Sequence, residues 1–340
     1  MSRHVKFILL VLVAALATGL LVSCDDVLPP IVADEPSGAV QPTPESDVLN
    51  VDTDNLPSTP IAPAPAIPIV LTPVASGVLV ESNDFALIDF SNKEDGYIMV
   101  RWNMETDAQL RVRVVGPTGV AYNYRLNSGG EFEVFPLSDG NGEYTIMVLE
   151  QIAGTEFAVA LTAVFYVQLI DEFAPFLRPN QYVNFTENCN VVAKGAQLVA
   201  GQTTLLGKVT EVYNFVITHI TYDVELAQGI VDGFIVGYIP DLDDVLARGY
   251  GICFDYAAVM TAMLRSQGIP TKMIFGFVGE VYHAWINVYS EETGWINGVI
   301  LFDGNEWTLM DPTFEATAGN AEALREFIGD GSSYVVMHLF

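Results

Sequence analysis

The chain has 340 residues, of which 42 are Asp or Glu and only 14 are Lys or Arg, so its formal net charge is -28 at pH 7. The length exceeds that of one ordinary domain, and 51% of the residues are hydrophobic, which is enough for two buried cores. Because phosphate binding requires a basic surface, this charge argues against nucleic acid as a partner. An acidic surface is instead suited to solubility and favours cationic partners.

The first 23 residues have the features of a secretory signal peptide in the expected order. Arg3 and Lys6 precede an apolar run over residues 7–22, which is short for a membrane span. The sequence Leu-Val-Ser-Cys at 21–24 resembles the lipobox of bacterial lipoproteins, in which the cysteine thiol receives a lipid. We therefore expect an extracytoplasmic protein that is anchored to the membrane through Cys24. A free cysteine after an ordinary signal peptide is the alternative.

Residues 24–73 are rich in Pro, Ala, Ser, Thr and acidic residues, which predicts an extended tether, with an ordered N-terminal arm as the alternative. Residues 74–170 contain short alternating runs separated by Gly-rich turns. These runs cover residues 97–102, 110–115, 132–135 and 144–149. The pattern predicts an antiparallel β-sandwich domain that precedes the rest of the chain. No residue in it has a catalytic pattern, so we expect a binding or spacer module.

Residues 171–340 are predicted to form a separate α+β domain. Apolar residues recur there at helical spacing, and a Gly and a Pro just after residue 267 end the third helix. The predicted helices cover residues 190–200, 205–220 and 253–267, and the predicted strands cover residues 272–278, 282–289 and 307–310. The first two helices are expected to pack under the segment that follows them.

Cys253 follows a glycine-containing turn and occupies the first turn of a predicted helix. The unpaired backbone N–H groups and the positive end of the helix dipole stabilise a thiolate there, and the thiolate is the nucleophilic form of cysteine. The backbone N–H of Cys253 can also hold a developing oxyanion. Asp255, in the same turn, is expected to satisfy the start of the helix. A small buried cysteine without reactivity is the alternative for Cys253.

A thiolate also needs a basic partner, and His283 lies in an alternating strand. In that strand Ala284 faces one side, whereas His283 and Trp285 face the other. We expect the imidazole to project from the strand toward a facing helix. Asp311 ends the next predicted strand and precedes Pro312, a position from which its carboxylate could orient the imidazole.

Three motifs therefore follow one another in a fixed order along the chain. They are Gly-x-Cys at 251–253, His-Ala-Trp at 283–285 and Met-Asp-Pro-Thr at 310–313. Together they resemble the core of the transglutaminase-like superfamily, over roughly residues 208–314. The resemblance implies a papain-like α+β arrangement in which a helix with the cysteine faces an antiparallel sheet. It assigns the nucleophile to Cys253, the general base to His283 and the orienting acid to Asp311.

Two further residues are candidates for the site by their position. Enzymes of this superfamily use an upstream polar or aromatic side chain as a second oxyanion donor, and Tyr222 occupies such a position. A core tyrosine with a satisfied hydroxyl is the alternative. Trp285 is a candidate for shielding the site from water, and the strand pattern explains it equally well.

The sequence predicts no metal site and no cofactor. The histidines after the signal peptide lack the spacing of metal ligands, and the acidic runs at 139–143 and 241–244 do not fit an EF-hand loop. No glycine-rich phosphate loop is present. If Cys24 is lipidated, only Cys189 and Cys253 remain for a disulfide bond. Such a bond would prevent Cys253 from acting as a nucleophile.

These residues predict that Cys253 attacks an amide carbonyl and forms a thioester acyl-enzyme. His283 would accept the thiol proton and later donate a proton to the leaving amine. An amine that resolves the thioester gives cross-linking, whereas water gives a peptidase or a deamidase. The expected substrates are proteins or peptides, such as cell-wall or surface proteins. The alternative is an inert surface-binding lipoprotein, because such folds can persist without activity.

Overall fold

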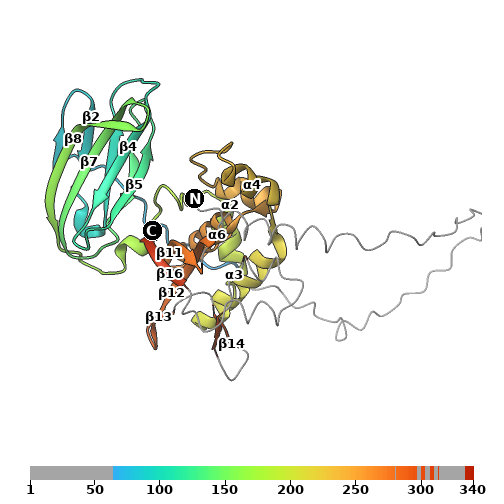
Figure 1. The fold of residues 1–340 in the computed structure, drawn as a ribbon. Coiled ribbons are helices and arrows are strands. Elements are labelled where there is room, and N and C mark those ends of the chain that lie inside the picture. Colours follow the sequence, from blue (N-terminus) through green and yellow to red (C-terminus); the bar gives the residue numbers. More distant parts are fainter. Residues whose placement is uncertain (1–63, 280, 297–299, 303–306, 310–312, 314–333) are drawn as a thin grey trace, which may run out of the picture.

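A computed structural model describes residues 64–340, except residues 280, 297–299, 303–306, 310–312 and 314–333 (Figure 1). Cys24 and Asp311 lie outside the described residues, so the lipidation of Cys24 and the role of Asp311 stay predictions. The described residues form antiparallel sheets together with several helices, which confirms the predicted mixed α+β class. None of the helices in these ranges has the length and apolar character that a membrane crossing needs.

Residues 80–167 form the N-terminal body, which consists of two four-stranded antiparallel sheets with the strand orders β1-β2-β3-β6 and β5-β4-β7-β8. The strands are β1 (Val80–Ser82), β2 (Ala86–Asp89), β3 (Tyr97–Trp102), β4 (Leu110–Val115), β5 (Ala121–Leu126), β6 (Glu133–Pro136), β7 (Gly142–Ala153) and β8 (Glu156–Val167). Burial alternates along β4 and β5, as expected when one face of a sheet is packed and the other faces water. Buried residues of both sheets belong to one apolar cluster, which is the packing that a β-sandwich requires.

Residues 190–340 form the C-terminal body, which combines helices with short and long strands (Figure 1). The elements are α2 (Asn190–Leu198), α3 (Leu205–His219), β9 (Thr221–Tyr222), α4 (Val224–Val231), α5 (Leu242–Arg248), β10 (Tyr250–Gly251), α6 (Cys253–Arg265), β11 (Thr271–Val278), β12 (Val281–Ser290), β13 (Gly294–Ile296), β14 (Ile300–Phe302), β15 (Trp307–Leu309) and β16 (Tyr334–Leu339). The three helices and three strands predicted for this part of the chain are all present, with slightly different ends. Helices α4 and α5 were not predicted.

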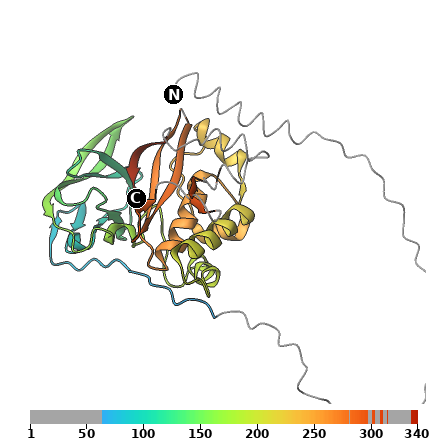
Figure 2. The same ribbon diagram turned by 90° about the horizontal axis from the view of Figure 1, so that it is seen from below.

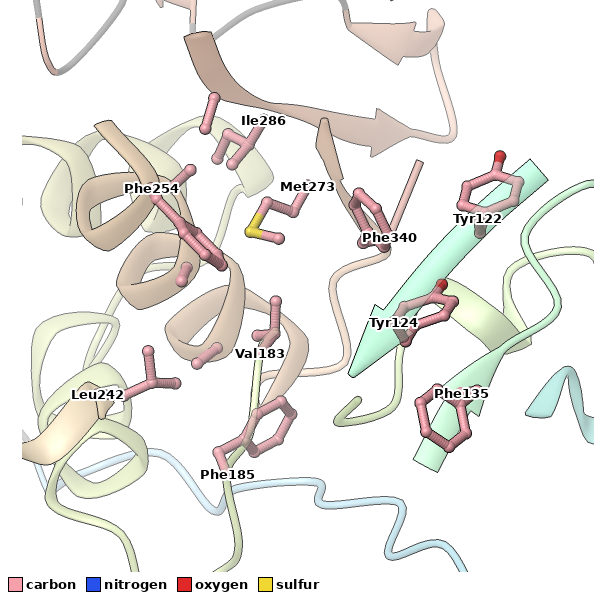
Figure 3. Packing of buried hydrophobic residues seen from close by; sticks show 14 of the residues in the cluster. Tyr122, Tyr124, Phe135, Val183, Phe185, Leu242, Phe254, Met273, Ile286 and Phe340 are labelled. Carbon is pink, nitrogen blue, oxygen red and sulfur yellow. The ribbon is translucent and has the colours of Figure 1, made fainter. Parts of the chain in front are cut away.

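The main sheet of the C-terminal body has the order β13-β12-β11-β16 and is antiparallel throughout. Figure 2 shows this sheet between the N-terminal body and the helices. Helix α6 is the central helix, because every residue after its first is buried. Phe254 of α6 lies beside Met273 of β11 and Ile286 of β12 (Figure 3). The helix that begins with Cys253 is therefore fixed by packing along its whole length.

The two bodies meet at an aromatic contact around Phe340, which follows β16. Its ring packs edge-on against Tyr122 and Tyr124 of the N-terminal body, with centroid distances of 5.8 Å in both pairs. The same ring contacts Tyr182 at 4.8 Å and Phe275 at 5.2 Å. Figure 3 shows Phe340 between the two bodies. Buried rings of this kind contribute more than their area alone, so the bodies share one apolar core.

The described end of the predicted tether lies against the C-terminal body. The N–H of Ala66 donates to the carbonyl of Ala196 in α2 at 3.0 Å, and the N–H of Ile69 donates to the carbonyl of Ser266 after α6 at 2.7 Å. Carbonyl groups at the ends of helices have no partner inside the helix, so these two contacts satisfy groups that would otherwise need water. Residues 66–69 therefore pack on the helices before the chain enters β1.

The acidic run that begins at Asp241 caps two helices. Asp241 Oδ1 accepts from the N–H of Asp244 at 3.0 Å and caps α5. Asp243 reaches across to α2, where its carboxylate accepts from the N–H groups of Asn190 and Val191, both at 2.9 Å. Carboxylates at helix starts satisfy free N–H groups and interact favourably with the helix dipole. Structural roles therefore account for this run, as the sequence predicts.

Arg265 ends α6 and is completely buried, with an exposed fraction of 0%. Its guanidinium donates to the carbonyl of Thr271 through Nε at 2.9 Å and through Nη2 at 2.8 Å. It also donates to the carbonyls of Arg178 at 2.7 Å and Phe340 at 2.6 Å. A buried charge is tolerated only when it is well hydrogen-bonded, and here the bonds join α6 to three other segments.

We expect Arg265→Met to lower the free energy of unfolding by about 3 kcal/mol, because it removes four hydrogen bonds to the carbonyl groups of three segments. Urea denaturation followed by circular dichroism measures this loss. Arg113→Met is the control, because Arg113 makes one exposed hydrogen bond to Asn123 and its loss should cost about 0.5 kcal/mol. A loss for Arg265→Met no larger than that of the control would contradict the structural role of Arg265.

Candidate functional site

Cys253 is the first residue of α6, and its side chain is half-buried. The chain enters this helix through β10, which pairs in parallel with β9 so that Gly251 lies opposite Tyr222. The N–H of Thr221 donates to the carbonyl of Gly249 and the N–H of Asp223 to that of Gly251, both at 2.8 Å. The short ladder therefore fixes the approach to Cys253 and holds Tyr222 next to it.

Gly251 is required because the side chain of Asp255 lies over it. A Cβ atom added at Gly251 would lie 2.5 Å from the Cβ of Asp255, which is closer than two carbon atoms can approach. In this position Asp255 Oδ2 accepts from the N–H of Ile252 at 2.7 Å. The glycine two residues before Cys253 thus allows the first turn of α6 to be capped by its own carboxylate, and Asp255 serves the helix start as the sequence predicts.

The buried carboxylate of Asp255 has two further partners, which the sequence did not predict. The hydroxyl of Tyr238 donates to Oδ1 at 2.6 Å, and Arg248 Nη2 lies 3.5 Å from the same oxygen. Arg248 also donates to the Tyr238 hydroxyl at 2.8 Å. Burial raises the pKa of Asp255 above its ordinary value, and these partners together with the N–H of Ile252 oppose that shift. The first turn of α6 is therefore held by a network that begins outside the helix.

Two tyrosines lie close enough to Cys253 for its charge to act on their hydroxyls. Burial raises the pKa of Tyr222 far above its ordinary value, and the neighbouring Cys253 adds to the shift. The pKa of Tyr282 is also raised, by burial first and by Cys253 second. A protonated hydroxyl can donate a hydrogen bond to an anion, so both side chains are candidate donors at Cys253, with Tyr222 partly buried and Tyr282 55% exposed. The sequence singled out Tyr222, but Tyr282 was missed, because its position beside His283 gave no separate signal.

His283 lies on β12, is 3% exposed and pairs with Gly276 of β11. Phe254 of α6 contacts Phe275, with ring centroids 4.8 Å apart, and the partner of Phe275 on β12 is Ala284. His283 is the neighbour of Ala284, so the start of α6 and His283 lie at the same end of the contact between α6 and β12. However, Ala284 is on the face toward α6, so the alternation of the strand places His283 on the opposite face.

This placement differs from the expectation that the imidazole would project toward the helix. The physical reason is the complete burial of α6, which requires small and apolar residues on the sheet face that covers it. Alternation correctly separated Ala284 from His283, but it could not decide which of the two faces turns toward α6. The structure holds Tyr222 beside the approach to Cys253 and places His283 on the face of β12 opposite α6.

Trp285 shares its strand face with His283 and is also 3% exposed. The two rings are nearly parallel, with centroids 6.2 Å apart and an interplanar angle of 16°. Trp285 also packs edge-on against Tyr334 at 5.1 Å and lies over Gly276, where an added Cβ atom would be 2.6 Å from the indole ring. Trp285 therefore packs beside the His283 imidazole. It lies on the face of β12 that points away from α6.

Cys189 and Cys253 are both free thiols, so the disulfide bond that would silence Cys253 is not formed. Cys189 precedes α2, where its sulfur accepts a hydrogen bond from the N–H of Thr186 at 3.3 Å. Within the ranges that the structure describes, no three His, Cys, Asp or Glu residues are grouped so that they could hold a metal ion.

We expect Asp255→Ala to lower the free energy of unfolding by about 2 kcal/mol, because it removes a helix cap and leaves the partly buried Tyr238 hydroxyl without its acceptor. Urea denaturation measures the loss. Asp223→Ala is the matched control, because Asp223 caps α4 through the N–H of Leu226 without the network around Asp255. If Asp255→Ala cost no more than Asp223→Ala, the network would not contribute to the start of α6.

Comparisons with known proteins place the site in a sequence family. Residues 193–312, which include Cys253, His283 and Asp311, match the model of the transglutaminase-like superfamily core. No curated protein gives a significant match. Among solved structures the chain is similar to a candidate cysteine protease from Cytophaga hutchinsonii, with 15% identity, a TM-score of 0.33 and coverage of 70% of this chain and 73% of the other.

Two further solved structures show similarity to the chain. A candidate protease from Parabacteroides distasonis has 10% identity and a TM-score of 0.28, with coverage of 61% of this chain and 62% of the other. Red sea bream transglutaminase has 15% identity and a TM-score of 0.24, with coverage of 64% of this chain and 48% of the other. The chain thus spans about half the length of the red sea bream enzyme.

Proposed function

We propose that this protein, whose residues 193–312 form a domain of the transglutaminase-like superfamily, is a cysteine acyl-transfer enzyme that acts on amide bonds of proteins or peptides. The observation that carries the proposal is the position of Cys253 at the amino end of the buried helix α6, beside two protonated tyrosine hydroxyls. A free thiol in this position has the N–H groups and the helix dipole that favour a thiolate.

In this proposal the thiolate of Cys253 attacks the carbonyl carbon of the substrate amide and forms a tetrahedral intermediate. The first backbone N–H groups of a helix have no partner inside the helix, so those at the start of α6 can donate to the oxyanion. Tyr222 supplies a second donor, because burial keeps its hydroxyl protonated. The amine then leaves, and the acyl group remains on Cys253 as a thioester.

His283 is proposed as the base that accepts the thiol proton and returns it to the leaving amine, with Asp311 as the group that orients it. Two features support this assignment: His283 lies at the end of β12 near the start of α6, and both residues fall within the superfamily match. β13 pairs with β12 only from Val288 onward, so among the described strands β11 alone borders His283. Proton transfer requires the imidazole to come within hydrogen-bonding reach of the Cys253 thiol.

A second candidate function is a binding protein in which the transglutaminase-like domain is inert. The position of His283 favours it, because the imidazole lies on the sheet face away from α6 and is stacked against Trp285. Proton transfer between the two residues occurs only where the imidazole reaches the Cys253 thiol. The two candidates therefore differ in one property that can be measured, the reactivity of the Cys253 thiol.

We expect Cys253 to react rapidly with iodoacetamide at neutral pH, and we expect His283→Ala to slow the reaction by about tenfold or more, because the thiolate loses its basic partner. Peptide mapping by mass spectrometry gives the rate for Cys253 separately from that for Cys189. Cys189 is the internal control, and its rate should not change. Equal slow rates for Cys253 with and without His283 would favour the inert binding protein.

We expect a glutamine peptide to release ammonia in the presence of the protein and a Cys253→Ala variant to release none. A labelled primary amine supplied with the peptide shows how the thioester is resolved. The net charge of -28 attracts cationic amines, so incorporation of the amine should exceed formation of the free acid. Formation of the acid alone would contradict cross-linking and indicate a hydrolase, and no ammonia from any glutamine peptide would contradict acyl transfer from glutamine.

A further inference from the structure

A cleft with a volume of about 680 Å³ lies between the N-terminal body and the segment that follows α4. One wall is the outer face of β4 and β5, and the other wall is formed by residues 236–239. A volume of this size is typical of ligand sites between domains. The side chains and backbone that the argument uses are those of Arg111, Asn123, Arg125, Tyr182, Gly237 and Tyr238.

Two arginines in this cleft lie directly opposite each other without an acidic partner. Arg111 of β4 and Arg125 of β5 are cross-strand partners, and like charges in such positions repel each other. Arg111 stacks on the ring of Phe157 at 4.0 Å, and Arg125 donates weakly to the carbonyls of Val236 and Gly237 at 3.4 and 3.3 Å. Among the described residues neither arginine forms an ion pair.

This pairing is unexpected in a chain with three acidic residues for each basic one, 42 against 14. Asp107 is the one acidic residue among those that line the cleft. It forms no ion pair within the described ranges, so it does not neutralise the two arginines. Paired guanidinium groups offer rigid forks of donors that match carboxylates in geometry. A carboxylate group is therefore a suitable ligand for the pair.

The cleft is connected to Cys253 by the side chains that form its floor. Tyr238 lines the cleft and donates its hydroxyl to Asp255, in the same helical turn as Cys253. Tyr182 also lines the cleft, and its ring packs edge-on against Phe254 with a centroid distance of 5.6 Å. A molecule bound between the two bodies would thus touch side chains that contact the start of α6.

The shape of the cleft favours an extended polypeptide. β5 is the edge strand of its sheet, and the outer edge of such a strand offers backbone groups to an extended segment. One of these groups is already used, because Gln181 Nε2 donates to the carbonyl of Arg125 at 2.7 Å. The remaining edge and the charged face of β4 and β5 can bind backbone and side chains together.

We propose that this cleft binds an acidic, extended segment of the polypeptide substrate, with its carboxylates at Arg111 and Arg125. The inference rests on the proposed function, because it identifies the cleft as the place from which a neighbouring amide reaches Cys253. It assigns the N-terminal body a part in the choice of substrate, which favours the binding module over the spacer among the two roles expected from the sequence.

Direct binding tests the proposal without turnover. The full-length Cys253→Ala variant is titrated against a fluorescein-labelled peptide that carries one glutamine flanked by glutamates, and fluorescence anisotropy gives the Kd. We expect this peptide to bind and the same peptide with lysines in place of the glutamates not to bind. Arg111→Ala together with Arg125→Ala should raise the Kd about tenfold or more, because charge-assisted bonds to two carboxylates are lost.

Two further variants test whether the effect comes from the overall charge of the protein or from the cleft itself. Lys194→Ala together with Lys208→Ala removes the same charge from α2 and α3, outside the cleft, and should leave the Kd nearly unchanged. Asn123→Glu keeps both arginines and adds a carboxylate to the cleft next to Arg113, so it should weaken binding of the acidic peptide without loss of the fold. Circular dichroism of each variant verifies that the protein remains folded.

Equal affinity for the two peptides, or no effect of the arginine substitutions on the Kd, would overturn the proposal. The result is independent of catalysis because the variant lacks the nucleophile. If the acidic peptide bound but no acyl transfer occurred in the wild type, the result would support the cleft as a binding site and contradict the enzymatic function. If acyl transfer occurred and the acidic peptide did not bind, the function would stand and the cleft would not be its substrate site.

Discussion

The buried carboxylate of Asp255 determines where α6 begins, and the candidate site depends on that position. The carboxylate can accept from the N–H of Ile252 only because Gly251 leaves room for it, and Tyr238 and Arg248 hold it from outside the helix. These contacts place Cys253 at the amino end of a helix that is otherwise completely buried. A nucleophile held in this way needs no movement of the backbone to present its sulfur, which is the main advantage of a preorganised site.

The same network connects the site to the rest of the molecule. Tyr238 belongs to the wall of the cleft between the two bodies, and Phe340 joins both bodies through four aromatic contacts. The Tyr238 hydroxyl and the Tyr182 ring therefore link the cleft to the start of α6, and the N-terminal body is part of the frame that holds the site. Arg265 fixes the other end of α6 through bonds to three segments.

Much of the fold could be predicted from local patterns. Alternation located β3, β4, β6 and β7, and helical spacing with stop signals located α2, α3 and α6. β5 was not predicted, because its inward residues are largely tyrosines, whose preference for burial is weaker than that of aliphatic residues. The position of Cys253 at the start of a helix followed from the glycine-containing turn before it, and Tyr222 was a candidate by its upstream position. The partners of Asp255 and the face that His283 occupies could not be predicted, because both depend on contacts between distant segments.

The proposed function depends most on the covalent acyl intermediate at Cys253. This intermediate can be trapped by a rapid acid quench of the protein during turnover of p-nitrophenyl acetate, followed by peptide mapping with mass spectrometry. We expect an acetyl group on the peptide that contains Cys253 and none on the peptide that contains Cys189. An unmodified Cys253, in a protein whose thiols still react with iodoacetamide, would show that the proposed acyl transfer is wrong.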